Sequence, residues 1–260
     1  MGGIIDNGFS AFTEEDDLPL VAQALPANLK LLDVMLKSDP TNERMLRLAS
    51  EGYSSYALAF LEDSDVVRAR EFYLRGRDYG LRILRQDPEI ARALDGSPDE
   101  LRSVLARRSK DEVPAAFWTA FGWASCITLS LNDPDIIAGL PTAQVLMEFV
   151  AGTDSSFYYG GAELFLGTLY GTRPVLLGGN SERSRQYFEE ALRINGGKFL
   201  MTYVYEARSY AVQTQNEQLF EELLTRVRET PLDVLPEFKL ANAIAKSKAA
   251  RLLARKSELF

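Results

Sequence analysis

The chain has 260 residues, of which 46% are apolar and 25% charged, and its formal net charge is −8. This composition is typical of an ordinary globular protein, and the acidic balance argues against nucleic acid, whose phosphates require clustered Lys and Arg. Histidine is absent, which excludes Ser–His–Asp and Cys–His catalysis and removes the commonest metal ligand. The single cysteine, Cys126, lies in an apolar stretch and cannot form an internal disulfide or a thiolate metal cluster. We therefore expect no enzymatic activity, cofactor or metal site.

Residues 1–19 are predicted to form an exposed lead-in, because they contain Gly, Asp and Pro and turn acidic at Glu14–Asp17. No signal peptide is visible after Met1, and we expect that a targeting segment has been removed. The cellular compartment of the protein therefore does not follow directly from this sequence. No run of about 18 apolar residues is apparent, which predicts that nothing spans a bilayer.

From Leu20 almost to the end, the hydrophobic pattern is helical. The first stripe, which stops at Asp39-Pro40, has helical spacing and consists of Leu25, Leu29, Leu32 and Leu36. No alternating strand pairs with hairpin turns are found, so the chain is predicted to be all-α. We expect a single helical-repeat domain over 20–260, with an insertion at about 85–114 where three prolines interrupt the pattern.

A weak internal repeat has the spacing of a 34-residue helix–turn–helix unit. The repeat expects, in order, large, large, small, large, small, large, small and Pro residues. In its best copy these positions are taken by Tyr203, Glu206, Ala207, Tyr210, Leu219, Leu223, Arg226 and Pro231. Further starts at Leu46, Trp118 and Leu166 give about four degenerate tetratricopeptide-like units, and Pro236–Leu253 is predicted to be a closing helix. Such units bury their apolar faces only by stacking, which predicts an α-solenoid that binds other molecules.

Aromatic residues, glycines and one arginine are concentrated between Phe157 and Asn180. This segment is a candidate pocket wall, in which Tyr158, Tyr159 and Tyr170 supply apolar contact and Arg173 holds a carboxylate. The alternative is that the glycines allow close helix crossings, the tyrosines fill the core and Arg173 braces the backbone.

A second aromatic group lies near the start at Trp118. Trp118 and Phe121 share one helical face, whereas Trp123 points elsewhere, which suggests that one face packs inside and the other lines a groove or a subunit contact. Packing in the core alone is the alternative for either tryptophan. Carboxylate pairs such as Glu189-Glu190 are adjacent on a helix and do not face each other, so no catalytic pair is predicted.

Four further motifs carry a family resemblance, which extends from about Leu25 onward. They are Tyr159–Gly167, Arg173-Pro174, Leu177–Gly179 and Gly197–Met201. In these motifs the chain resembles TatT, the T component of tetratricopeptide-repeat-associated TRAP transporters. The resemblance implies an all-helical periplasmic lipoprotein that forms a homotrimer with a central pore and associates with the solute-binding P subunit. It also implies a hydrophobic cleft for apolar or amphipathic ligands such as carboxylates with hydrocarbon tails.

The resemblance has one departure, because members carry a lipidated cysteine that this chain lacks and Cys126 cannot replace. Membrane contact is therefore expected only through an inferred lipid anchor. The leading hypothesis is a non-enzymatic subunit of a solute uptake system, whose ligand-binding residues are Trp118, Trp123, Tyr158, Tyr159, Tyr170 and Arg173. The alternative is a generic peptide- or protein-binding repeat scaffold without a small-molecule site.

Overall fold

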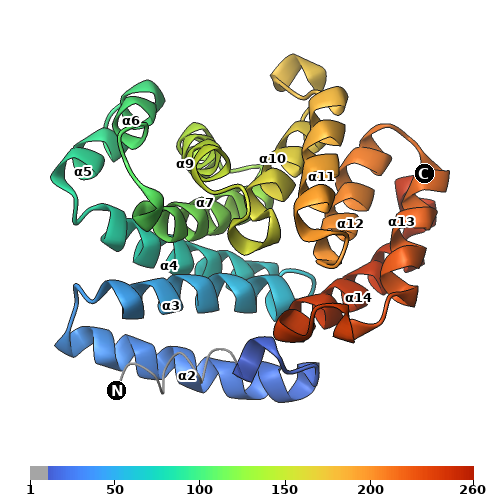
Figure 1. Ribbon diagram of the computed structural model, residues 1–260, viewed down its shortest axis with the longest axis horizontal. Coiled ribbons are helices and arrows are strands. Elements are labelled where there is room, and N and C mark those ends of the chain that lie inside the picture. Colours follow the sequence, from blue (N-terminus) through green and yellow to red (C-terminus); the bar gives the residue numbers. More distant parts are fainter. Residues whose placement is uncertain (1–10) are drawn as a thin grey trace. The chain divides into compact units, whose positions relative to one another are not determined.

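The computed structural model describes residues 11–260, and every regular element in this part of the chain is a helix (Figure 1). The all-α prediction is confirmed, whereas the tetratricopeptide arrangement of the helices stays a prediction. The described chain separates into two compact units. The first unit is Ala22–Phe157, and the second is Tyr158–Phe260 together with the N-terminal residues up to Val21. A single domain over 20–260, with its insertion, also stays a prediction.

The first unit is built mainly from long helices joined by short turns. Its elements are α2 (Leu18–Ser38, which begins just before the unit), α3 (Glu43–Tyr56), the π-helix η1 (Ala57–Leu61), α4 (Val66–Leu84), α5 (Pro88–Leu94), α6 (Pro98–Leu105), η2 (Lys110–Glu112), α7 (Val113–Thr128), α8 (Pro134–Ile137) and α9 (Leu140–Thr153). Helix α2 begins at Leu18, two residues before the predicted start.

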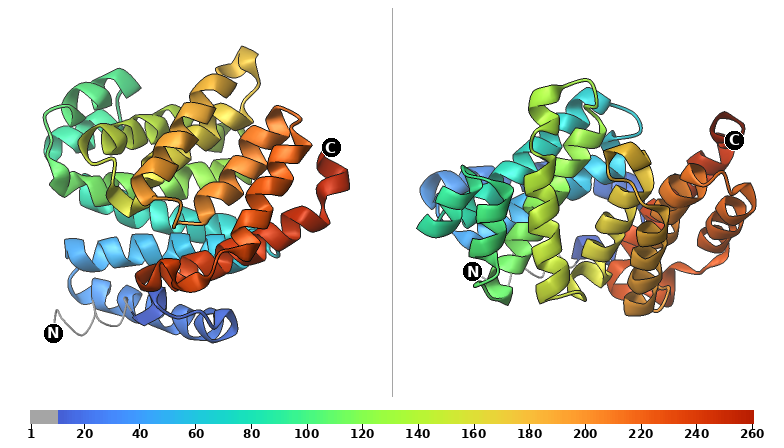
Figure 2. Two further views of the ribbon diagram at one scale, coloured as in Figure 1. Left: turned by 45° about the vertical axis from the view of Figure 1, so that its right-hand side comes forward. Right: turned by 90° about the horizontal axis from the view of Figure 1, so that it is seen from above.

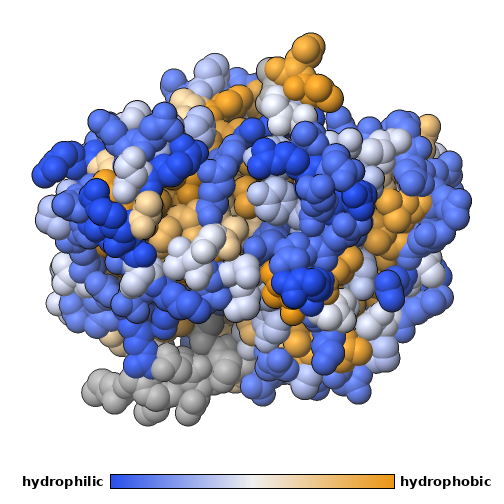
Figure 3. Space-filling view, turned by 45° about the horizontal axis from the view of Figure 1, so that its top comes forward, coloured by the Kyte–Doolittle hydropathy of each residue, from blue (hydrophilic) through white to orange (hydrophobic). Residues whose placement is uncertain are grey.

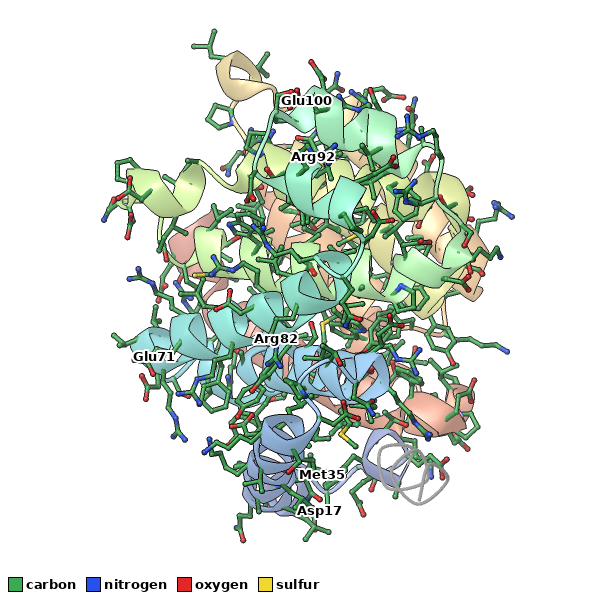
Figure 4. All side chains as sticks on the ribbon, turned by 90° about the vertical axis from the view of Figure 1, so that its left-hand side faces the viewer. Asp17, Met35, Glu71, Arg82, Arg92 and Glu100 are labelled. Carbon is green, nitrogen blue, oxygen red and sulfur yellow. The ribbon has the colours of Figure 1, made fainter. Side chains whose placement is uncertain are left out.

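Side-chain hydrogen bonds join the first helices of this unit to one another and to the turn after α2. Asp33 on α2 accepts hydrogen bonds from Tyr53 Oη at 2.8 Å and Tyr79 Oη at 2.7 Å, so one carboxylate ties α2 to both α3 and α4. Arg82 on α4, labelled in Figure 4, donates from Nη2 to the Pro40 carbonyl at 2.6 Å. These bonds fix the turn that the sequence places at Asp39-Pro40.

The segment 85–114 contains two short helices whose boundaries follow from their caps. Each begins with proline immediately after an N-cap, Asp87 for α5 and Ser97 for α6. Proline is well placed there because the first helical residue has no intrahelical use for its N–H group. Ser97 and Glu100 form a reciprocal capping box at the start of α6.

Helices α3, α4 and α7 cross closely because small residues lie where they meet. A Cβ atom added at Gly122 would lie 2.7 Å from the Tyr73 carbonyl oxygen, and one at Gly76 would lie 2.9 Å from the Ser50 carbonyl oxygen. Ser50 Oγ also donates to the Gly76 carbonyl at 2.6 Å. The crossings therefore bring the backbone of one helix against the backbone of the next, with no room for a methyl group.

By length and mean hydropathy alone, the segment Pro134–Thr153 is apolar enough to cross a membrane, although polar residues interrupt it; that nothing spans a bilayer stays a prediction. In the structure it is divided between α8 and α9 at Gly139. Helix α9 packs against α6 and α7 and buries Leu146 and Met147 completely. Its apolar residues are thus used in packing the first unit.

The second unit has a similar helical make-up with more short 3-10 turns. Its elements are η3 (Phe157–Tyr159, which begins at the last residue of the first unit), α10 (Gly161–Thr172), η4 (Val175–Leu177), α11 (Ser181–Asn195), α12 (Met201–Glu206), the π-helix η5 (Ala207–Ala211), α13 (Glu217–Glu229), η6 (Leu232–Val234), η7 (Pro236–Phe238), α14 (Lys239–Ala254) and α15 (Lys256–Leu259).

Helices α10, α11 and α12 pack on one another (Figure 2). Phe188 on α11 is fully buried. Helix α11 ends at Gly196, whose φ of 61° is the left-handed conformation that the Gly196-Gly197 pair predicts. The predicted closing helix is present, but α14 starts at Lys239, because Pro236–Phe238 forms a separate 3-10 turn.

Candidate functional site

The six candidate ligand-binding residues are divided between the two units. Trp118 and Trp123 lie on α7 in the first unit, whereas Tyr158, Tyr159, Tyr170 and Arg173 lie in the second unit. Within each unit, the structure shows which of these side chains share neighbours, and their role in binding stays a prediction.

Trp118 is a core residue of the first unit. It is 3% exposed and meets the rings of Phe117 and Phe121 edge-on at centroid distances of 5.0 and 5.6 Å. The T-shaped arrangement is the favourable one for aromatic quadrupoles. This environment agrees with the packing alternative that the sequence also allowed for Trp118.

Trp123 is half-buried and lies apart from that aromatic group. The Arg77 guanidinium is 5.3 Å from the centroid of its ring, within the range of a cation–π contact. A Cβ atom added at Gly139 would lie 2.0 Å from Trp123 Nε1, so the indole covers the backbone between α8 and α9. The prediction that Trp118 and Trp123 serve different faces of α7 is consistent with these contacts.

Tyr158 and Tyr159 belong to one aromatic cluster in the second unit, together with Phe199 and Phe238. Tyr159 is stacked on Phe199 with centroids 5.6 Å apart and meets Phe238 edge-on at 4.9 Å. Tyr158 meets the same two phenylalanines edge-on. The structure therefore brings these two candidate residues together with Phe199, which lies in the Gly197–Met201 motif, and with Phe238, which the sequence analysis did not single out.

The backbone under this cluster is left-handed over three consecutive residues. The φ angles are 49° at Tyr158, 59° at Tyr159 and 79° at Gly160. A non-glycine residue in this conformation costs about 1 kcal/mol or more and persists only where its surroundings hold it. Here Asn195 Nδ2 donates to the Tyr159 carbonyl at 3.1 Å, so the two tyrosine rings are held on a fixed turn.

The hydroxyl group of Tyr159 extends from the cluster to Glu237. It donates to Glu237 Oε1 at 3.0 Å. Partial burial, together with this hydrogen bond and the negative charge of Glu237, raises the pKa of Tyr159 to about 12. Tyr159 therefore stays protonated at neutral pH and acts as a hydrogen-bond donor.

Tyr170 and Arg173 lie one turn apart at the end of α10. Tyr170 is stacked parallel to Tyr187 with centroids 5.8 Å apart, and the Arg183 guanidinium lies 4.2 Å from the Tyr170 centroid. Arg173 is half-buried, and burial lowers the pKa of its guanidinium while the nearby Tyr170 raises it. Arginine remains charged at neutral pH, so a cation is held at a partly desolvated position beside an aromatic stack.

Sequence reasoning missed two buried carboxylates in the second unit. Glu163 on α10 is 4% exposed and Glu206 on α12 is 8% exposed. Burial, with a contribution from the negative charge of Glu189, raises the pKa of Glu206 to about 7. A signal was present for Glu206, because it occupies a position of the repeat that usually takes a large apolar residue.

The surface hollow on α13 differs from the predicted pocket. It is lined by Glu221, Glu222, Thr225, Arg226, Glu229 and Thr230, so its walls are mainly charged rather than aromatic. Among the described residues, no group of three His, Cys, Asp or Glu side chains is placed to hold a metal ion.

Comparison with known proteins gives a family for nearly the whole chain. Residues 14–260 match the model of the TRAP transporter T-component. The chain belongs to this family. It is therefore an accessory component of a TRAP transport system, periplasmic or membrane-associated, and its family is one of transporter subunits rather than enzymes.

A relative of this T-component occurs in Treponema pallidum (strain Nichols). The chain is 26% identical to an uncharacterized protein of that organism over 265 residues, covering 96% of this chain and 82% of the relative. The alignment thus runs through both compact units, and includes the segments that carry the candidate residues.

Proposed function

We propose that the chain is a non-enzymatic subunit of a periplasmic TRAP-type solute uptake system, which binds the solute-binding P subunit and an apolar or amphipathic carboxylate. The observation that carries the proposal is the family match over residues 14–260. A homotrimeric assembly and a lipid anchor in the precursor form part of the same proposal.

The proposed ligand site combines one cation with aromatic surface. Arg173 is half-buried beside Tyr170, and a guanidinium that is partly shielded from water binds a carboxylate more strongly than an exposed one does. Tyr158 and Tyr159 contribute apolar surface from their fixed turn in the same unit, whereas a role in binding for Trp118 and Trp123, which lie in the first unit, stays a prediction. Arg173 orients the negative head group and the aromatic rings contact the hydrocarbon part.

The first experiment measures the mass of the purified protein by light scattering, alone and mixed with the solute-binding subunit from the same organism. A trimer that captures this subunit is the expected result. A monomer that does not bind the subunit would overturn the transporter-specific part of the proposal and favour a generic repeat scaffold.

The role of Arg173 is tested with decanoate as a probe of a carboxylate with a hydrocarbon tail. Arg173→Ala should weaken decanoate binding by about tenfold or more, because a charge-assisted hydrogen bond is lost, while the circular dichroism spectrum and the unfolding temperature stay unchanged. The matched control is Arg193→Ala, which removes an exposed arginine that pairs with Glu190. Unchanged affinity of Arg173→Ala, or its unfolding, would contradict the role.

A second candidate function is a protein- or peptide-binding scaffold without a small-molecule site. The observation that favours it is the environment of the aromatic residues, since Trp118 is 3% exposed and Tyr158 and Tyr159 pack on phenylalanines. In that case decanoate binds neither the wild type nor the Arg173→Ala variant, although a protein partner still does.

A further inference from the structure

The four rings of the aromatic cluster in the second unit are not held equally. Phe238, on the short turn η7, meets the rings of Tyr158 and Tyr159 edge-on, with centroids 5.4 and 4.9 Å apart. The same two tyrosines contact Phe199, with centroids 5.9 and 5.6 Å apart. Each tyrosine is therefore in contact with two phenylalanines, and the attachment of each ring decides which of them can leave.

Phe199 is a fixed member of the cluster. It is 4% exposed, and the loop that carries it is bound to the fully buried Asn242 of α14. Leu200 N donates to Asn242 Oδ1 at 2.9 Å, and Asn242 Nδ2 donates to the Lys198 carbonyl at 3.1 Å. One side chain thus holds the backbone on both sides of Phe199, which cannot leave the cluster without breaking these bonds.

The two tyrosines are also fixed, because α11 braces the left-handed turn beneath them. A Cβ atom added at Gly160 would lie 3.3 Å from Ala191 Cα, so the turn lies directly against the backbone of α11. Asn195 Nδ2 donates to the Tyr159 carbonyl and to Thr202 Oγ1, at 3.1 Å in both cases. Strained backbone conformations persist only where their surroundings hold them, and they are concentrated at ligand clamps and switch regions.

Phe238, in contrast, is carried by an exposed turn of three residues. Pro236 and Glu237 are exposed, and Phe238 is half-buried. Phe238 N donates to the Leu235 carbonyl at 3.0 Å, and Tyr159 Oη donates to Glu237 Oε1 at 3.0 Å. Within residues 11–260, Glu237 has no other side-chain hydrogen bond or ion pair. One hydrogen bond and the contacts of one ring therefore hold η7 on the tyrosines.

Glu237 and Phe238 together have the chemistry of the proposed ligand. The carboxylate of Glu237 accepts a hydrogen bond while the ring of Phe238 contacts aromatic rings, as the two parts of an amphipathic carboxylate would. Polar side chains cover most of the face shown in Figure 3, and apolar side chains form separate patches between them. Uncovered aromatic rings would add to these patches. Phe238 shields part of the two tyrosine rings from water.

We propose that Glu237 and Phe238 form an internal plug of the ligand site, in which the Phe238 ring occupies the place of a ligand's hydrocarbon tail. The hydrogen bond from Tyr159 to Glu237 keeps the plug closed. A tail that packs on the tyrosines displaces Phe238 while Phe199 stays in place. This inference rests on the proposed function, and adds to it a device that weakens binding in proportion to the fraction of molecules in which the plug is closed.

The probe has to reach the tyrosines from Arg173, which follows the other end of α10. The 12 residues of Gly161–Thr172 rise by about 18 Å along the helix axis. A carboxylate bound at Arg173 therefore needs a long chain to reach the plug, and oleate is the probe used.

Calorimetry measures oleate binding to the wild type, Phe238→Ala and Glu237→Gln. We expect the dissociation constant to fall about fivefold or more for Phe238→Ala, because the plug no longer competes with the tail. For Glu237→Gln it should fall about twofold or more, because a neutral amide is a weaker acceptor than a carboxylate. Because Glu237 is exposed, this second variant should fold as the wild type does.

Two controls match these variants in the same unit. Phe260→Ala removes another half-buried ring, which packs on Phe220 of α13, and should leave oleate affinity unchanged. Glu222→Gln removes one exposed negative charge from α13, and shows how far the loss of a charge alone favours an anionic ligand.

A second readout follows the turn itself by hydrogen exchange in the wild type. The Phe238 amide, which donates to Leu235, should exchange faster when oleate is added, because η7 leaves the cluster. The Leu200 amide, which donates to Asn242, should be unchanged. Slower exchange at Phe238 would mean that η7 closes over the ligand, and would overturn the inference.

The outcomes separate the inference from the proposed function. A higher dissociation constant for Phe238→Ala would make Phe238 a wall of the site, and equal affinity of all variants would make it a packing residue. Either result overturns the inference and leaves the proposed function standing. If neither the wild type nor any variant binds oleate, the ligand part of the proposed function fails together with the inference. Should circular dichroism show that Phe238→Ala is unfolded, Glu237→Gln and the exchange measurement decide.

Discussion

The helix crossings of the two units both depend on glycine, but the glycines meet different neighbours. In the first unit, Gly122 on α7 faces the backbone of α4, where an added Cβ atom would lie 2.7 Å from the Tyr73 carbonyl oxygen and 3.0 Å from Arg77 N. In the second unit, Gly167 on α10 faces the ring of Phe188 at 3.2 Å. A ring can turn or shift by a few tenths of an ångström, whereas a helix backbone cannot move without its whole element. The same residue type should therefore be essential in one unit and replaceable in the other.

The units also differ in what they bury. The crossings of the first unit enclose small residues such as Ser50 and Ser54, whereas the second unit encloses the carboxylates of Glu163 and Glu206. A buried carboxylate is costly in its charged form. Stability of the second unit should therefore depend on pH through Glu206.

The largest effect is expected at the backbone-facing glycine. Gly122→Ala should lower the free energy of unfolding by about 3 kcal/mol, because the methyl group forces α7 away from α4. Urea denaturation followed by circular dichroism measures this change. Gly152→Ala is the matched control, since no atom lies within 4 Å of its added Cβ atom, and alanine in a helix should stabilise by up to about 1 kcal/mol. If Gly122→Ala had the same free energy of unfolding as the wild type, the crossing of α7 and α4 would not be tightly packed.

The next effect concerns Glu206, whose pKa of about 7 in the folded protein compares with an ordinary value of 4.5. Because folding favours the protonated form, the contribution of Glu206 to stability is greatest below pH 4.5 and is lost as the pH rises through about 7. Glu206→Gln keeps the shape without the charge, and should be more stable than the wild type at pH 8 by on the order of 2–3 kcal/mol.

Unfolding titrations of Glu206→Gln between pH 5 and 8 measure this difference. Some pH dependence should remain, because burial also raises the pKa of Glu51 in the first unit to about 7, with Arg47 acting in the opposite direction. The control is Glu222→Gln, which removes a charge from the exposed side of α13. A pH profile of Glu206→Gln that parallels that of the wild type would show that Glu206 is already solvated.

The smallest effect is expected at the ring-facing glycine. Gly167→Ala should change the free energy of unfolding by less than about 1 kcal/mol, because the higher helix propensity of alanine offsets the small displacement of Phe188. Measured beside Gly122→Ala in the same denaturant series, it tests the comparison directly. Equal losses for the two variants would mean that the ring of Phe188 is as immovable as the backbone of α4.

Much of the fold could be predicted from the spacing of apolar residues and from the glycines that end helices. The stripe at Leu25, Leu29, Leu32 and Leu36 is buried on α2, and the glycine pair after Asn195 ends α11 as predicted. The high mean hydropathy of Pro134–Thr153 was missed, because Gly139 and Pro141 interrupt its run of apolar residues. The division into two compact units has no signal in the sequence, because the segment around Phe157 contains residues that also suit a continuous helical array.

The candidate site was less predictable, because sequence spacing does not show which aromatic residues fill a core. Tyr158 and Tyr159 were chosen together and do share a cluster, but Phe199 and Phe238 reach it from elements far along the chain. The left-handed turn beneath them could not be anticipated, since tyrosine seldom adopts a positive φ.

Each unit contains a π-helical turn, and these turns give the chain tolerance to changes in length. Glu62 N donates to the Ala57 carbonyl at 2.9 Å, and Val212 N donates to the Ala207 carbonyl, in both cases across five residues instead of four. Such a turn holds one more residue than an α-helical turn. Deleting one residue within Ala57–Leu61 or Ala207–Ala211 would convert the turn to α-helix while the following helix keeps the same face toward its neighbours. Homologues one residue shorter at these positions would preserve the packing of every later helix, whereas a deletion inside α4 would turn its small residues away from α7.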